Sequence, residues 1–143
     1  MTESFVAETR ITIDAPAAAV WQALIDPELV KQYLHGTNMR TDWNVGGDIS
    51  WSGEWKGQSY EDKGKVLKFE PQTLIVYTHW SPLGGTLDEP QNYHTVTYEL
   101  AERGGQTVLT LKQDNNPSRE EADKMAQNNW APVLQGLKAV AER

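Results

Sequence analysis

Two of the three histidines lie at the ends of predicted strands that flank a long loop. If this loop is centred between Thr86 and Leu87, the strands pair as an antiparallel hairpin that places His79 opposite His94. Facing imidazoles, with the phenol of Tyr98 on the same strand face, could act as a general acid and base. The alternative is that these groups line a polar cavity, and this interpretation is favoured because the pattern fixes no further reactive group beside them.

A metal site would need more ligands than this pair supplies. Two histidines lack the third protein ligand that a zinc site requires, and the loop acids Asp88 and Glu89 need not turn inward. The chain has no cysteine, which excludes disulfides, thiolate metal sites, cysteine nucleophiles and iron–sulfur clusters. We therefore predict no metal and no cofactor.

Motifs of several other enzyme classes are missing from the sequence. It contains no phosphate-binding GxxxxGK(S/T) or GxGxxG pattern, no GxSxG and no HExxH. The adjacent Gly46 and Gly47 lead into a strand rather than a helix, so we interpret them as a tight turn or bulge. Nucleotide binding through a phosphate loop, serine hydrolysis and zinc proteolysis are therefore disfavoured.

Aromatic side chains gather on one face of another predicted strand. Ile49, Trp51, Gly53 and Trp55 share that face, and a glycine between two indoles leaves space that a larger side chain would fill. We predict that this space belongs to a mostly apolar pocket for a small molecule, with an ordinary packed core as the alternative. The residues expected to line the pocket are Trp51, Trp55, Tyr77, His79, His94, Val96, Tyr98, Leu109, Leu111, Met125, Asn129 and Val133.

Composition limits the class of protein and its partners. The 143 residues are 38% hydrophobic and 23% charged, which suits one domain over residues 1–143. The formal net charge of -7 disfavours nucleic acid and anionic membrane surfaces, and the basic stretch 56–68, which includes Glu61 and Asp62, is interpreted as a solvated strand face. No apolar run reaches the roughly 18 residues of a spanning helix, and residues 1–6 lack signal-peptide features. We therefore expect no membrane partner and a cytoplasmic location.

Hydrophobic periodicity predicts one strand, two short helices, six further strands and a long C-terminal helix. Asp14 is expected to cap the first short helix, and Asp26 the second. Pro132 lies inside the last helix and predicts a kink over residues 128–132. The economical arrangement is an α+β fold in which a strongly curved antiparallel sheet grips the long helix. The predicted strands span residues 5–13, 40–44, 48–55, 58–69, 73–80, 92–101 and 107–114.

Several short motifs occur in an order and spacing that resemble a known family. They are Ala15-Pro16, Val20-Trp21, Leu24, Asp26-Pro27, Val45-Gly46-Gly47, Val96-Thr97-Tyr98-Glu99-Leu100, and Trp130 before Leu134 and Leu137. Together, from about Phe5 to Ala141, they resemble the family named for the activator of Hsp90 ATPase, within the START and Bet v 1-like (SRPBCC) superfamily. The resemblance implies a helix-grip fold, in which Trp21 and Trp130 are structural residues that tie helices to the sheet.

The resemblance is compatible with three functions. The first is binding of a small hydrophobic or aromatic molecule in a cavity between the sheet and the C-terminal helix. The second is interaction with an Hsp90-type chaperone, for which we expect weak or no stimulation because the second, N-terminal domain of the eukaryotic activator has no counterpart in these residues. The third is a cyclase, dehydratase or hydrolase that moves protons with His79, His94 or Tyr98. Binding is favoured over catalysis, and the sequence selects neither a monomer nor a homodimer.

Overall fold

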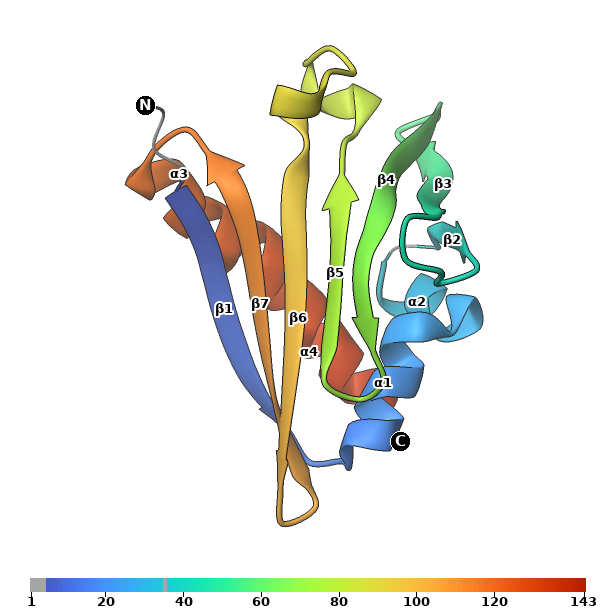
Figure 1. The fold of residues 1–143 in the computed structure, drawn as a ribbon, viewed down its shortest axis with the longest axis vertical. Coiled ribbons are helices and arrows are strands. Elements are labelled where there is room, and N and C mark those ends of the chain that lie inside the picture. Colours follow the sequence, from blue (N-terminus) through green and yellow to red (C-terminus); the bar gives the residue numbers. More distant parts are fainter. Residues whose placement is uncertain (1–4, 35) are drawn as a thin grey trace.

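The computed structural model describes residues 5–34 and 36–143. One seven-stranded antiparallel sheet has the strand order β1-β7-β6-β5-β4-β3-β2, and it curves around the C-terminal helical segment (Figure 1). This arrangement confirms the predicted α+β helix-grip fold. The strands are β1 (Phe5–Ile13), β2 (Asn38–Thr41), β3 (Asp48–Trp55), β4 (Gln58–Glu70), β5 (Leu74–His79), β6 (His94–Arg103) and β7 (Gln106–Asn116). The helices are α1 (Ala17–Ile25), α2 (Pro27–Tyr33), α3 (Arg119–Lys124) and α4 (Ala131–Ala141), and short 3-10 turns span Pro82–Gly84 and Pro90–Asn92.

The two short helices after β1 begin in different ways. Asp26 caps α2 as predicted, because its Oδ1 accepts a hydrogen bond of 3.0 Å from the N–H of Glu28. The prediction that Asp14 caps α1 is wrong. Instead, the N–H of Ala17 donates to Oε1 of Glu102, a carboxylate from β6, over 2.6 Å. A residue distant in sequence therefore supplies the cap.

The hairpin of β5 and β6 has the predicted register. His79 is paired with His94, and Tyr77 with Val96. The strand expected over residues 40–44 lies earlier, at Asn38–Thr41, and Trp43 just after it has a left-handed backbone with φ of 60°. A residue in that conformation cannot continue the pairing, so β2 ends before it.

The C-terminal helical segment is interrupted where Pro132 predicts a kink. The interruption is a π-helical segment, Met125–Trp130, between α3 and α4, and the N–H of Ala131 bonds to the carbonyl of Ala126, five residues earlier. Pro132 has no N–H, so the carbonyl of Asn128 cannot receive its usual α-helical bond. Within residues 5–34 and 36–143, no helix is long and apolar enough to cross a membrane.

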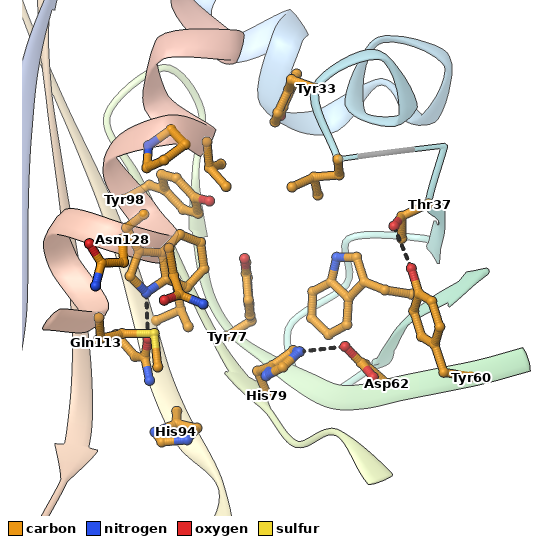
Figure 2. A pocket seen from close by; sticks show the side chains of 18 residues that line it. Tyr33, Thr37, Tyr60, Asp62, Tyr77, His79, His94, Tyr98, Gln113 and Asn128 are labelled. Carbon is orange, nitrogen blue, oxygen red and sulfur yellow. Dashed lines mark hydrogen bonds and ion pairs between the residues drawn. The ribbon is translucent and has the colours of Figure 1, made fainter. Parts of the chain in front are cut away.

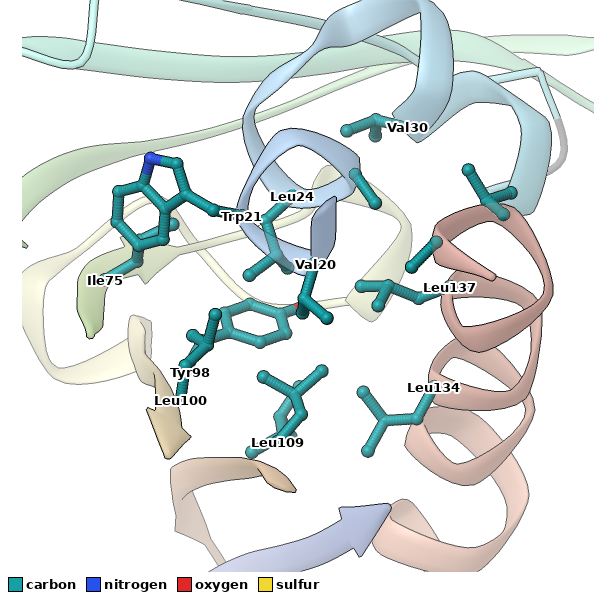
Figure 3. Packing of buried hydrophobic residues seen from close by; sticks show 14 of the residues in the cluster. Val20, Trp21, Leu24, Val30, Ile75, Tyr98, Leu100, Leu109, Leu134 and Leu137 are labelled. Atoms are coloured by element: carbon teal, nitrogen blue, oxygen red, sulfur yellow. The ribbon is translucent and has the colours of Figure 1, made fainter. Parts of the chain in front are cut away.

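The hydrophobic core joins α1 and α4 to the sheet (Figure 3). Leu134 and Leu137 of α4 are buried against the sheet, and Trp21 of α1 packs with its ring centroid 5.1 Å from that of Phe69. The position of Trp21 fits the structural role that the resemblance implied. This packing closes one end of the space between helix and sheet.

Gly136 permits a close approach of α4 to α2. A Cβ atom at this position would lie 2.8 Å from Cβ of Tyr33. Real Cβ contacts are essentially never this short, so any larger residue would push the helices apart. The glycine therefore helps to hold Tyr33 in its place beside the space above the core.

Candidate ligand-binding site

A cavity of about 660 Å³ lies between the sheet and the C-terminal helical segment (Figure 2). Small-molecule sites in proteins commonly have volumes of about 300–1,000 Å³. Strands β3 to β7 form one wall, the π-helical segment and the start of α4 form the opposite wall, and α2 with the loop after it contributes a third side. The lining residues are Tyr33, Leu34, Thr37, Trp51, Tyr60, Asp62, Tyr77, His79, His94, Val96, Tyr98, Gln113, Met125, Asn128, Asn129, Trp130, Pro132 and Val133.

Most of the residues predicted to line a pocket meet at this cavity. Leu109 and Leu111 do not: both face inward but are fully buried in the core with residues of α1 and α4, so their predicted place in the pocket wall is wrong. The side chain of Trp55 lies outside the described part of the structure. The predicted residues at the cavity wall are Trp51, Tyr77, His79, His94, Val96, Tyr98, Met125, Asn129 and Val133.

His79 is held by a partly buried carboxylate. Its Nε2 lies 3.0 Å from Oδ2 of Asp62. Because a carboxylate oxygen accepts hydrogen bonds, Nε2 of His79 carries the proton. The second oxygen of Asp62, Oδ1, is buried and has no hydrogen-bond partner among the described residues. The carboxylate is therefore only partly satisfied.

The interpretation of Asp62 as part of a solvated strand face is wrong. In β4 it occupies the same face as Tyr60, Gly64 and Val66, and Val66 is fully buried. Both Tyr60 and Asp62 line the cavity. The period-two alternation that ends at Val66 was the signal that could have identified Asp62 as an inward-facing residue.

His94 faces the same cavity but has a different partner. Its Nδ1 lies 2.9 Å from the backbone carbonyl oxygen of Asp114, which can only accept, so Nδ1 carries the proton. In the neutral form of each ring, the remaining nitrogen is an acceptor: Nδ1 of His79 and Nε2 of His94. This end of the cavity is consequently rich in hydrogen-bond acceptors.

Aromatic rings cover the sheet wall beside the histidines. The ring of Trp51 lies with its centroid 5.0 Å from that of Tyr77 and meets the His79 ring edge-on, also at 5.0 Å. The ring centroids of Tyr77 and Tyr98 are 6.3 Å apart. Burial raises the pKa of Tyr98 to about 12 and that of Tyr77 well above its usual value. Both phenols are therefore neutral at physiological pH.

The helix wall contributes amide groups. Nε1–H of Trp130 donates to Oε1 of Gln113 on β7, so Trp130 both ties the helix to the sheet and lines the cavity. Asn128 and Asn129 lie in the π-helical segment and complete this polar side. Gln113 and Asn128 were missed, although Gln113 continues the inward face of β7 and Asn128 begins the predicted kink.

The space beside Gly53 is taken by Tyr60. The two residues are register partners in β3 and β4, and a Cβ atom on Gly53 would lie 2.8 Å from Oη of Tyr60. Oη of Tyr60 also forms a hydrogen bond of 2.7 Å with Oγ1 of Thr37. The prediction that Gly53 leaves room for a ligand is wrong, because the glycine makes room for a wall residue instead.

The charges in the wall are sparse. Among the described residues that line the cavity, none is Lys or Arg, and Asp62 is the one carboxylate. Nor does the part of the chain that the structure describes contain a group of three or more His, Asp and Glu side chains that could hold a metal ion. The cavity is thus mostly aromatic, with one acidic group and two imidazoles at its polar end.

A comparison with protein families shows to which family the chain is related. A family model for Activator of Hsp90 ATPase homolog 1-like protein matches residues 14–142. The chain belongs to this family. The match begins directly after β1 and extends past the end of α4, so it includes every element that lines the cavity. Comparison with curated proteins gives no significant match.

Solved structures share the architecture of this member of the activator family. It is similar to ChR145 from Cytophaga hutchinsonii, with 43% identity, coverage of 96% of this chain and 94% of that chain, and a TM-score of 0.84. The Aha1 protein from Colwellia psychrerythraea, solved in solution as a dimer, has 23% identity, coverage of 96% of both chains and a TM-score of 0.69. Ara h 8.0201 has 12% identity, coverage of 97% of this chain and 98% of that chain, and a TM-score of 0.74. The last two similarities show the fold alone.

Proposed function

We propose that this chain binds a small molecule with a hydrophobic or aromatic body in the cavity between the sheet and the C-terminal helical segment. The observation that carries the proposal is the cavity of about 660 Å³, whose wall is mainly aromatic and aliphatic with a few polar groups at one end. Walls of this composition hold a ligand by apolar contact and orient it with the polar groups. The rings of Trp51 and Tyr77 supply the apolar surface, and Val133 faces them from α4.

The first experiment is native mass spectrometry of the purified protein, followed by a thermal-shift screen. The screen uses fatty acids, aromatic acids, aromatic amines and polycyclic aromatic compounds. A ligand that binds only the folded state stabilises it by about 2.7 kcal/mol at a hundredfold excess over its Kd. We expect a rise in Tm for at least one hydrophobic class. No co-purified mass and no shift with any class would contradict the proposal.

A cavity-filling variant locates the site. Val133→Trp places an indole in the cavity, and we expect it to reduce ligand affinity by at least about tenfold, because the ligand must give up its contact with the helix wall. Val45→Trp is the matched control, since Val45 is 66% exposed and lies outside the cavity wall. Calorimetry should give unchanged affinity for the control. Equal affinities in both variants would place the ligand elsewhere.

The second candidate function is contact with an Hsp90-type chaperone. Family membership favours it, because the family is named for activation of that ATPase. The test is a pull-down with the chaperone combined with an ATPase assay over a range of molar ratios. Stable capture with a change in ATPase rate would support the candidate, and no effect at high excess would remove it.

A further inference from the structure

A carboxylate at the polar end of the cavity is only partly satisfied by hydrogen bonds. The Asp62 carboxylate receives one hydrogen bond there, from Nε2 of His79 over 3.0 Å. Its Oδ1 is buried and has no donor among the described residues. Buried carboxylates normally receive several donors or face a cation. None of the described lining residues is Lys or Arg, so the histidines are the groups of this wall that could supply a cation, and only when they are protonated.

The two imidazoles add acceptors to the same end. Nε2 of His79 and Nδ1 of His94 donate to Asp62 and to the backbone carbonyl of Asp114 respectively. In the neutral rings, the opposite nitrogens are therefore free of protons and can accept. An ammonium group has three donors and no acceptor, so it complements this arrangement. A ligand carboxylate has acceptors alone and would meet like charge.

Aromatic rings line much of the cavity that a cation would enter. Six of the lining residues carry a Trp or Tyr ring, namely Tyr33, Trp51, Tyr60, Tyr77, Tyr98 and Trp130. A cation within about 6 Å of the face of such a ring is attracted by its quadrupole, most strongly when water is excluded. The net charge of -7 on the whole chain also attracts cations at long range. Charge, acceptors and rings therefore favour the same class of ligand.

We propose that the cavity selects an organic cation: a primary ammonium group attached to an aromatic or apolar body. The ammonium lies at the His79 and His94 end, and the body lies against Trp51 and Tyr77. This inference rests on the proposed binding function and narrows its ligand class. Asp62 is a positioning residue: its Oδ2 fixes the tautomer of His79, and its carboxylate supplies negative potential at this end of the cavity.

Three naphthalene probes test the inference on the unmodified chain. They are 2-naphthylmethylamine, 2-naphthylmethanol and 2-naphthoate, which share a ring and carry a positive, neutral or negative polar end. Calorimetry at neutral pH should give an amine affinity at least about tenfold above that of the alcohol, with the naphthoate weakest. An alcohol that binds as tightly as the amine, or a naphthoate that binds most tightly, overturns the inference. If all three bind equally, the binding function stands and this inference fails; if none binds, this inference fails, and the thermal-shift screen alone decides the binding function.

A variant that removes the charge of Asp62 tests whether this residue causes the preference for the amine. Asp62→Asn keeps the shape of the side chain, so we expect the amine affinity to fall about tenfold while the alcohol affinity changes little. Asp48→Asn is the matched control, because Asp48 is exposed on β3 and loses the same formal charge outside the cavity. Equal losses for amine and alcohol in Asp62→Asn would show a merely structural role and overturn the assignment. The ranking of the probes on the unmodified chain does not depend on the folding of either variant.

Discussion

Two buried tyrosines, Tyr77 and Tyr98, and the partly buried Tyr33 make the stability of the fold depend on alkaline pH. Burial raises the pKa of Tyr33 and Tyr77 well above their usual value and that of Tyr98 to about 12, because a phenolate is poorly solvated inside the protein. In the unfolded chain a phenol titrates near 10. Above that pH the unfolded state loses protons that the folded state keeps, so stability falls as pH rises. The contribution is fully present below about pH 10 and is lost progressively toward the folded pKa.

In the variant Tyr98→Phe, the unfolding free energy should fall less steeply with rising alkaline pH than in the wild type. The wild type is expected to lose up to about 2.7 kcal/mol of unfolding free energy through Tyr98 alone between pH 10 and 12, since one pKa unit corresponds to about 1.4 kcal/mol. The variant cannot titrate at this position, although removal of the hydroxyl changes its unfolding free energy by a constant amount at all pH values. Urea unfolding at pH 8 and pH 11 measures both effects. An identical pH dependence in the two proteins would show that Tyr98 does not carry the expected share.

The polar residues of the site were harder to predict than the apolar ones, because their partners come from other elements. Asp62 sits in a charged run, and its neighbour His79 is reached only through the pairing of β4 with β5. That pairing has a register shift between Val66 and Lys68, which periodicity does not reveal. Gln113 likewise acquires its role from Trp130, on the far side of the cavity. Alternation along a strand predicts which face of the sheet each residue lies on. It does not predict which residue of another element lies opposite.

At the scale of elements, two local features were predictable for physical reasons. The β5–β6 register follows from the centre of the connecting loop, and it places His79 beside His94. The interruption of the C-terminal helix follows from Pro132, which lacks a donor. The prediction placed Leu109 and Leu111 in the pocket wall because alternation shows that both face inward. Alternation does not show which part of a strand the helices cover and which part lines the cavity. Packing of α1 and α4 decides that boundary.

The contact of α2 with α4 gives a prediction at the same scale. Gly136→Ala would bring a Cβ atom to 2.8 Å from Cβ of Tyr33, so α2 must move. We expect a net loss of about 1–2 kcal/mol in unfolding free energy, in which overpacking exceeds the gain in helix propensity. Gly84→Ala is the control, since nothing lies within 4 Å of its added Cβ. Urea unfolding of both variants provides the measurement, and a stabilised Gly136→Ala would contradict the close approach.

At the scale of the whole molecule, the open sheet has two edges that could pair with another chain. The edge at β2 is short, with four residues, whereas β1 has nine. Side chains from the C-terminal helical segment reach that long edge: Arg119 donates to the carbonyl of Val6 over 2.6 Å, and Lys138 to the carbonyl of Thr12 over 3.2 Å. Occupied carbonyls and nearby charge are ways in which sheet proteins avoid pairing at their edges.

We therefore expect that the β1 edge does not pair with a second copy of this chain, because Arg119 and Lys138 cover it. In the wild type, hydrogen exchange of residues 5–13 should be independent of protein concentration. The double variant Arg119→Ala with Lys138→Ala should self-associate, with added protection of the same residues, because the freed carbonyls can accept from a second strand. Lys124→Ala is the control: Lys124 pairs with Glu120 on the same helical segment, and its removal uncovers no strand carbonyl. Sedimentation measures the association. Concentration-dependent protection of residues 5–13 in the wild type would mean that these side chains do not block the edge, and that a dimer forms through it.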